Sequence, residues 1–252
     1  MGDVPYERQH DARDSGQRER HVTKRQRLGL TALALPIVAG LVWLGVWQVH
    51  RLAWKRALIA QVDARLAAAP VAAPGLNRWP TLSAGDAYTR LSVHGRYLAG
   101  RTTFTQAVTD LGPGYWVMTP LVSDRGFTLL VNRGFVPQAM KGRPIPAPSG
   151  NATVTGLLRL SEPRGGFLRA NDPSVDRWYS RDVAAIAAKR RIGPAAPYFI
   201  DADAATSPGW PRGGLTVIRF PNNHLQYALT WFAMAAALAG AVGWMALRPP
   251  KD

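Results

Sequence analysis

The sequence predicts a membrane protein of the α+β class, in which two transmembrane helices flank a β-rich extramembrane domain that contains one helix. Two stretches without a charged side chain, residues 28–49 and 225–247, support the helices. As α-helices these 22 and 23 residues reach about 33 and 35 Å, which is enough to cross a hydrocarbon core of about 30 Å. Between them, short apolar runs alternate with Gly, Pro, Asn and Asp, the pattern of β-strands and turns.

These observations divide the chain into five parts. We expect a disordered cytoplasmic tail over residues 1–27, a transmembrane helix over 28–49, a periplasmic β-rich domain over 50–223, a second transmembrane helix over 224–247 and a cytoplasmic tail over 248–252. Seven Lys or Arg precede the first span, and Arg248 and Lys251 follow the second. The positive-inside rule therefore places both termini in the cytoplasm and the central domain in the periplasm. We expect a multi-pass protein of the inner (plasma) membrane.

A cleaved signal peptide is the alternative for the first span. The apolar core of a signal peptide is only about 7–15 residues long and ends at a small-residue cleavage site. The run here is longer, and it ends in Trp47, Gln48 and Val49. An uncleaved anchor fits better, and helix-forming residues extend the predicted helix through 51–69.

Seven strands are predicted within the central domain. They cover residues 88–97, 102–108, 115–122, 127–136, 153–160, 198–201 and 215–220, with a turn at 111–114 and a hairpin joining 115–122 to 127–136. One helix is expected to begin at a Ser180 cap and to end at Gly193. Antiparallel strands with one helix suggest a small barrel or a sandwich.

Charge and composition exclude several classes of function. The chain has a net charge of +15 and no cysteine, which excludes disulfides, thiolate metal sites and a cysteine nucleophile. No hydrolase, P-loop or dinucleotide motif is present, so we expect no catalytic residues and no enzyme. A basic domain can bind nucleic acid, but tethering to a membrane favours anionic lipid headgroups instead, so the bilayer and not nucleic acid is the expected partner.

His224 is the most informative single residue. It follows Pro221-Asn222-Asn223 and begins the second span, at headgroup level on the outer face. Its imidazole could ligate a haem iron, with Tyr227 and Trp231 following on the same helix. The alternative is a hydrogen-bonded interfacial histidine within an aromatic belt.

Three arginines form the second candidate signal. Arg51, Arg212 and Arg219 all lie near the predicted outer membrane surface, where guanidinium groups could pair with haem propionates. Contact with lipid headgroups is the alternative for each of them.

Taken together, the motifs resemble the Surfeit locus protein 1 family of cytochrome c oxidase assembly factors. The resemblance runs from about residue 40 to 231, in the order LGVWQVHRLAWK (44–55), HGRYL (94–98), GYWVMTPL (114–121), VNRGFVP (131–137), NDP (171–173) with WYSRD (178–182), PYFID (197–201) and PNNHLQYALTW (221–231).

The resemblance implies a role in maturing oxidase subunit I, at the step where haem a is inserted. The expected partners are subunit I and its assembly intermediates, and the expected cofactor is transiently bound haem a. His224 would be the metal ligand, Tyr227 and Trp231 would wall the macrocycle, and Arg219 and Arg51 would hold the propionates. The alternative function is a cofactor-free membrane scaffold that stabilises nascent subunit I.

Overall fold

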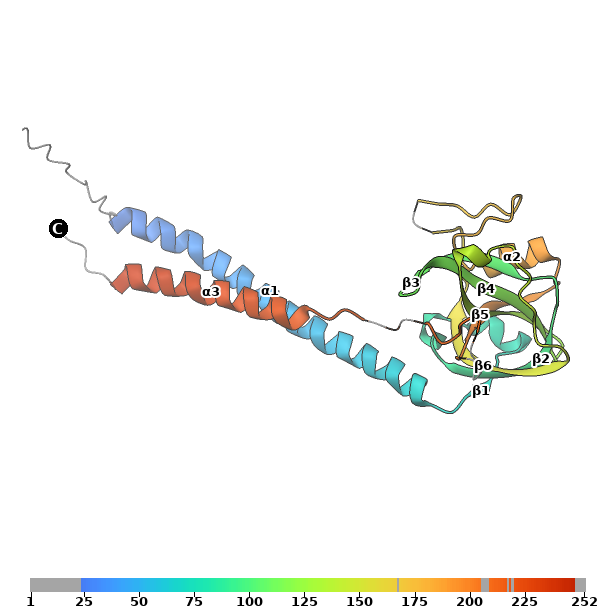
Figure 1. Ribbon diagram of the computed structural model, residues 1–252. Helices are drawn as coiled ribbons and strands as arrows, with labels where there is room; N and C mark the ends of the chain where they lie inside the picture. The colour runs from blue at the N-terminus through green and yellow to red at the C-terminus, as the bar shows by residue number, and fades with distance from the viewer. Residues whose placement is uncertain (1–23, 167, 205–208, 217, 219, 248–252) are drawn as a thin grey trace, which may run out of the picture. The chain divides into compact units, whose positions relative to one another are not determined.

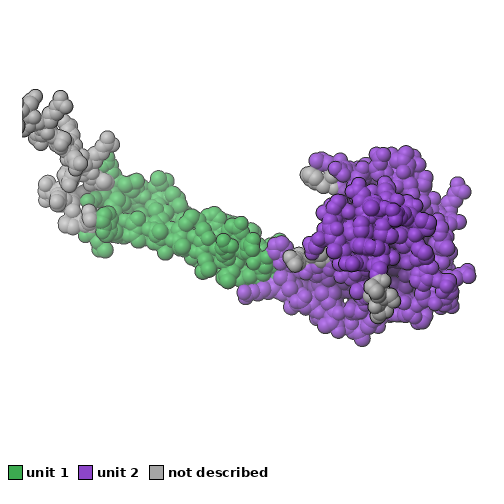
Figure 2. Space-filling model, in the orientation of Figure 1, with its two compact units in different colours: residues 1–55, 222–252 green, residues 56–221 purple. Residues whose placement is uncertain are grey.

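The computed structural model describes residues 24–166, 168–204, 209–216, 218 and 220–247 (Figure 1). The chain forms two compact units, one of residues 1–55 with 222–252 and one of residues 56–221 (Figure 2). The expected tails, 1–27 and 248–252, fall almost entirely outside the described residues.

The first unit contains two candidate membrane-spanning helices. They are α1 (Lys24–Ala67), whose first part belongs to this unit, and α3 (His224–Leu247). Both are long and apolar enough to cross a membrane, and only 11% of the residues in the most apolar window of each are buried. Such exposed apolar helices are unlike the core helix of a soluble domain, whose apolar face is covered. α1 runs without a break through 51–67, which confirms the predicted extension of the first helix.

A glycine lets α1 and α3 approach closely. A Cβ atom placed on Gly45 of α1 would lie 2.5 Å from the ring of Phe232 on α3, so only glycine leaves room for the ring. Nearby on α3, Ala228 and Ala235 are buried. Small residues at such positions allow the van der Waals packing that holds helices together in lipid.

The second unit is built on a closed five-stranded barrel. Around the ring the strands follow the order β2 (Arg90–Tyr97), β6 (Asn151–Leu160), β7 (Ala195–Ala202), β5 (Thr128–Pro137) and β4 (Gly112–Ser123), and β4 pairs again with β2. β1 (Val71–Ala72) lies beside β2, and β3 (Thr103–Thr109) continues the sheet outward from β4. This arrangement confirms the predicted β-rich domain. Of the two predicted architectures, a barrel or a sandwich, the domain adopts the barrel.

Two apolar clusters hold the barrel together. One draws on all five barrel strands, with members that include Leu91, Leu121, Leu129, Leu158 and Ile200. The other joins β4, β5 and β7 to the helix α2 (Val183–Arg190), whose Ile186 is fully buried. α2 is therefore the single helix that the sequence predicted in this domain, and it covers one side of the barrel.

Several sequence predictions in this domain were wrong in detail. β5 and β7 run parallel, because β7 returns to lie between β5 and β6 after the chain has passed through α2. The predicted turn over 111–114 is shorter, since Thr109 already pairs with Gly112 at the start of β4. The described residues of 215–220 form no strand. Just before them, Arg212 forms an isolated bridge with Phe135 of β5.

The ends of α2 also differ from the prediction. Asp182 caps the helix by accepting a hydrogen bond from the backbone N–H of Ala185. Ser180 is instead engaged by its own contacts, donating to the carbonyl of Glu162 at 2.6 Å. The helix ends at Arg190, and its C-cap Arg191 adopts the left-handed conformation (φ 52°), two residues before the expected Gly193.

Candidate functional site

His224 is the first residue of α3, and its side chain contacts α1. Its Nδ1 lies 2.7 Å from Oε1 of Gln48. With the amide oxygen of Gln48 as the acceptor, the imidazole carries its proton on Nδ1. The lone pair then resides on Nε2, and a metal-binding histidine has this form, with its other ring N–H donated to a fixed acceptor.

Arg51 and Tyr227 each lie about one helical turn from a member of the Gln48–His224 pair. Arg51 lies one turn after Gln48 on α1, is exposed, and stacks its guanidinium 4.0 Å from the ring centroid of Trp54. Tyr227 lies one turn after His224 on α3 and is 53% exposed. Both side chains are therefore accessible to a molecule bound beside His224.

Trp231 and Asn222 carry polar atoms that the described residues do not satisfy. The indole N–H of Trp231, two turns after His224, is buried without a hydrogen-bond partner, and so is Oδ1 of Asn222. Buried polar groups are normally paired, so orphaned ones mark a place where a partner is missing. Arg219, the remaining predicted site residue, lies outside the described residues.

Within the described residues, no three His, Cys, Asp or Glu side chains are grouped to hold a bare metal ion. A single histidine suits a metal that brings its other ligands with it, as iron does in a porphyrin. The residues present thus fit a haem better than a free ion.

Sequence reasoning missed Gln48, the partner of His224. The only available signal was its place in the string LGVWQVHRLAWK at the outer end of the first span. A polar side chain within a membrane-spanning helix normally faces a partner, but no local pattern pointed to a residue 176 positions away.

A second cluster of motif residues lies inside the barrel domain. The carboxylate of Asp201, 3% exposed, accepts hydrogen bonds from Asn132 at 2.8 Å, Arg159 at 2.9 Å and Arg181 at 3.2 Å. Thr216 adds a fourth donor at 3.0 Å. Both oxygens of this buried carboxylate are engaged, so the cluster is structural.

Glu162 extends the cluster towards the surface. It forms an ion pair with Arg181 and lies 3.7 Å from Arg159. Burial alone would raise the pKa of Glu162, but the hydrogen bonds and charge of Arg181, helped by the charge of Arg159, hold its pKa below its usual value. The carboxylate therefore stays ionised at neutral pH.

Gly134, in the string VNRGFVP, is a glycine for a local reason. It adopts φ +126°, and a Cβ there would lie 2.1 Å from the carbonyl oxygen of Arg212. This close approach allows the reciprocal backbone hydrogen bonds between Phe135 and Arg212, at 2.8 and 2.9 Å.

Comparison with known proteins decides the family. The model of the SURF1 family matches residues 35–236. Surfeit locus protein 1 of Mus musculus is 36% identical over 218 residues, covering 77% of this chain and 68% of the relative. The human protein of the same name is 35% identical, covering 81% and 73%, and a SURF1-like protein of Drosophila melanogaster is 32% identical, covering 83% and 74%. The chain belongs to the SURF1 family.

The SURF1 family match includes both candidate sites. Residues 35–236 contain Gln48 on α1, the whole barrel and the first half of α3 with His224. The seven strings noted in the sequence all lie within it. Several of them, including VNRGFVP, WYSRD and PYFID, meet at Asp201. These strings therefore maintain the barrel, whereas LGVWQVHRLAWK and PNNHLQYALTW supply the Gln48–His224 pair.

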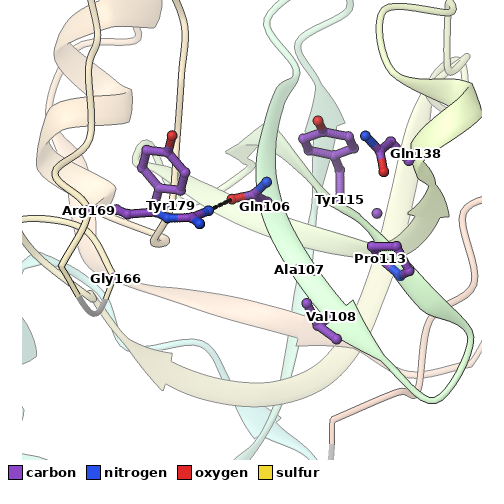
Figure 3. A pocket seen from close by; sticks show the side chains of 10 residues that line it. Gln106, Ala107, Val108, Pro113, Tyr115, Gln138, Gly166, Arg169 and Tyr179 are labelled. Atoms are coloured by element: carbon purple, nitrogen blue, oxygen red, sulfur yellow. Dashed lines mark hydrogen bonds between the residues drawn. The ribbon is translucent and has the colours of Figure 1, made fainter.

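A groove of about 370 Å³ lies beside β3 and β4 (Figure 3). Gln106 and Tyr115 line it from the two strands, and Arg169 and Tyr179 line it from the segment before α2. Arg169 stacks on Tyr179 with its guanidinium carbon 5.5 Å from the ring centroid, and it donates to Oε1 of Gln106 at 3.4 Å. Its cation is already engaged within the protein, so the groove offers no strong anchor of its own.

Proposed function

We propose that this protein is an assembly factor for haem–copper cytochrome c oxidase that assists the insertion of haem a into subunit I. Its membership of the SURF1 family supports a role in cytochrome c oxidase assembly. The observation that supports the haem step is the hydrogen bond between His224 and Gln48.

In this proposal each residue has a defined task. Gln48 fixes the imidazole of His224 in the tautomer that presents the Nε2 lone pair. Bound haem a would supply an iron that this nitrogen could ligate. Arg51, and Arg219 outside the described residues, would pair with propionates, and Tyr227 and Trp231 would contact the macrocycle. A single histidine ligand would allow the haem to be released.

The same proposal assigns a location and partners. The termini lie in the cytoplasm, the barrel domain lies in the periplasm, and α1 and α3 cross the inner membrane. The protein partners are subunit I and its assembly intermediates, reached within the lipid bilayer.

A cofactor-free scaffold for nascent subunit I is the alternative. The exposed apolar side chains of both helices favour it, among them Leu33, Trp43 and Leu229, each more than 60% exposed. Such a surface can pack against the helices of a membrane-embedded partner as well as against lipid.

The visible spectrum of the full chain, purified in detergent and supplied with haem a, separates the two functions. The wild type should show a Soret band that His224→Ala removes. Gln48→Leu should weaken haem binding by about 10- to 100-fold, because it removes the acceptor that orients the imidazole. His50→Ala, an exposed histidine of α1, is the matched control and should bind normally. An unchanged band in His224→Ala would reject the haem site and leave the scaffold.

A further inference from the structure

The barrel domain contains a basic cavity that the proposed haem function does not use. Its volume is about 640 Å³, within the range of about 300–1,000 Å³ typical of ligand pockets. Residues from the end of β2, the following turn, the loop 147–150 and the end of α2 form its walls. It lies entirely within the second unit.

Three arginines give this cavity its charge. Arg96, Arg101 and Arg191 line it, and no Asp or Glu does. Among the described residues none of the three forms an ion pair with a carboxylate. Arg101 donates to the carbonyl groups of Arg190 and Arg191 at the end of α2, which fixes its position and leaves its positive charge in place.

Tyr97 adds a neutral donor to the same cavity. Burial raises the pKa of its hydroxyl to about 12, although the charge of Arg133 opposes the shift. The phenol therefore keeps its proton at neutral pH. Tyr97 lines the cavity, and within the described part of the chain its O–H donates to no protein group.

Arg133 holds two parts of the cavity wall in place. Its guanidinium stacks 5.6 Å from the ring centroid of Tyr97 and donates to the carbonyl groups of Ile145 and Pro146, the latter at 2.7 Å. These contacts anchor the proline-rich loop just before the wall formed by residues 147–150. One motif arginine thus holds both Tyr97 and the loop in place.

The rest of the lining is mostly apolar, with hydroxyl groups from Thr128 and Ser149. Leu98 and Ile192 contribute side chains to the cavity beside the arginines. A ligand that satisfies both kinds of surface carries an anionic group and a carbon moiety. Arginine binds planar or tetrahedral oxyanions through paired N–H donors. Several arginines can therefore neutralise a phosphate group, whether it is a doubly charged monoester or a singly charged diester.

From this geometry we infer that the cavity between Arg96, Arg101, Arg191 and Tyr97 binds a phosphate-bearing anion with an attached apolar group. The phosphate group could belong to an anionic phospholipid or to a free phosphoester; the chemistry of recognition is the same. The inference does not depend on haem binding, because it concerns residues of the barrel domain alone.

The test is titration calorimetry on the full chain in a non-ionic detergent, with two probes. Glycerol 3-phosphate represents the free phosphoester, and dihexanoyl phosphatidylglycerol represents the lipid. The double variant Arg96→Gln/Arg191→Gln should bind at least about tenfold more weakly, because two charge-assisted contacts are lost. Both side chains are exposed, so the fold should be preserved. Affinity should also fall as salt is raised.

The matched control is Arg164→Gln/Arg177→Gln, which removes two exposed charges that do not line the cavity. Its affinity should equal that of the wild type. Binding of both probes indicates that the phosphate group suffices, and binding of the lipid alone indicates that the apolar part is required; either supports the site. Absence of binding by both probes, or equal losses in the cavity and control variants, would overturn it.

Discussion

At the scale of single residues, Asp201 is the group on which the polar interior of the barrel depends. Asp201→Ala would leave Arg159 and Arg181 without their buried partner. Breaking a buried ion pair in this way costs about 3–5 kcal/mol. Thermal unfolding of the full chain in detergent should show this loss.

Asp203→Ala provides the comparison. Its side chain is 40% exposed and pairs with Arg90, and exposed pairs contribute about 0–1 kcal/mol. If the two variants unfolded at the same temperature, the buried network would have no special role.

Glu162 predicts how stability depends on pH. Its pKa is lowered in the folded protein, against burial, by Arg181 and Arg159. A depressed pKa stabilises the fold above the carboxyl's ordinary value of about 4.5, and that contribution is lost as pH falls through the lower, folded-state pKa. The melting-temperature difference between wild type and Glu162→Gln should therefore be present at pH 7 and shrink towards pH 3. A difference that is independent of pH would contradict this assignment.

Predictability from the sequence differed between the two kinds of site. His224 could be proposed because it begins a predicted membrane-spanning helix and lies in a recognisable string. Gln48 could not, since only the packing of α1 on α3 brings it to His224. Asp201 was also missed, because its donors come from β5, β6 and two loops that meet only in the closed barrel.

At the scale of elements, Gly45 sets how closely α1 and α3 pack. Alanine at this position would place its Cβ 2.5 Å from the ring of Phe232, and overpacking of this kind costs about 1–3 kcal/mol. A Cβ on Gly40 of the same helix would meet no atom within 4 Å, so Gly40→Ala should be neutral or slightly stabilising through helix propensity. Thermal stability in detergent should fall for Gly45→Ala alone; equal effects would show that the close contact does not matter.

The strands themselves were largely predictable, but their arrangement was not. Six of the seven predicted segments overlap strands, because alternating apolar residues and turn residues are local signals. The parallel pairing of β5 with β7 and the closing pair of β2 with β4 are contacts between distant segments. Residues 215–220 resemble a strand locally, but the local pattern cannot show whether a partner strand pairs with them, and their described residues pair with none.

At the scale of the whole molecule, we predict that both termini lie on the cytoplasmic side. A phosphatase or fluorescent reporter inserted after Gly150, in the loop between β5 and β6, should report the periplasm. The same reporter after Asp252 should report the cytoplasm. Identical results at the two sites would contradict a two-span topology.

We propose that His224 ligates haem a during its insertion into subunit I. The direct measurement is the reduced-minus-oxidised haem a absorbance of membranes from cells that carry His224→Ala, relative to the amount of inserted variant protein. The variant should insert and fold, because His224 lies at a helix end and not in a packed core, while haem a absorbance falls well below that of wild type and of His50→Ala. Normal haem a absorbance with a stably inserted His224→Ala protein would contradict the claim.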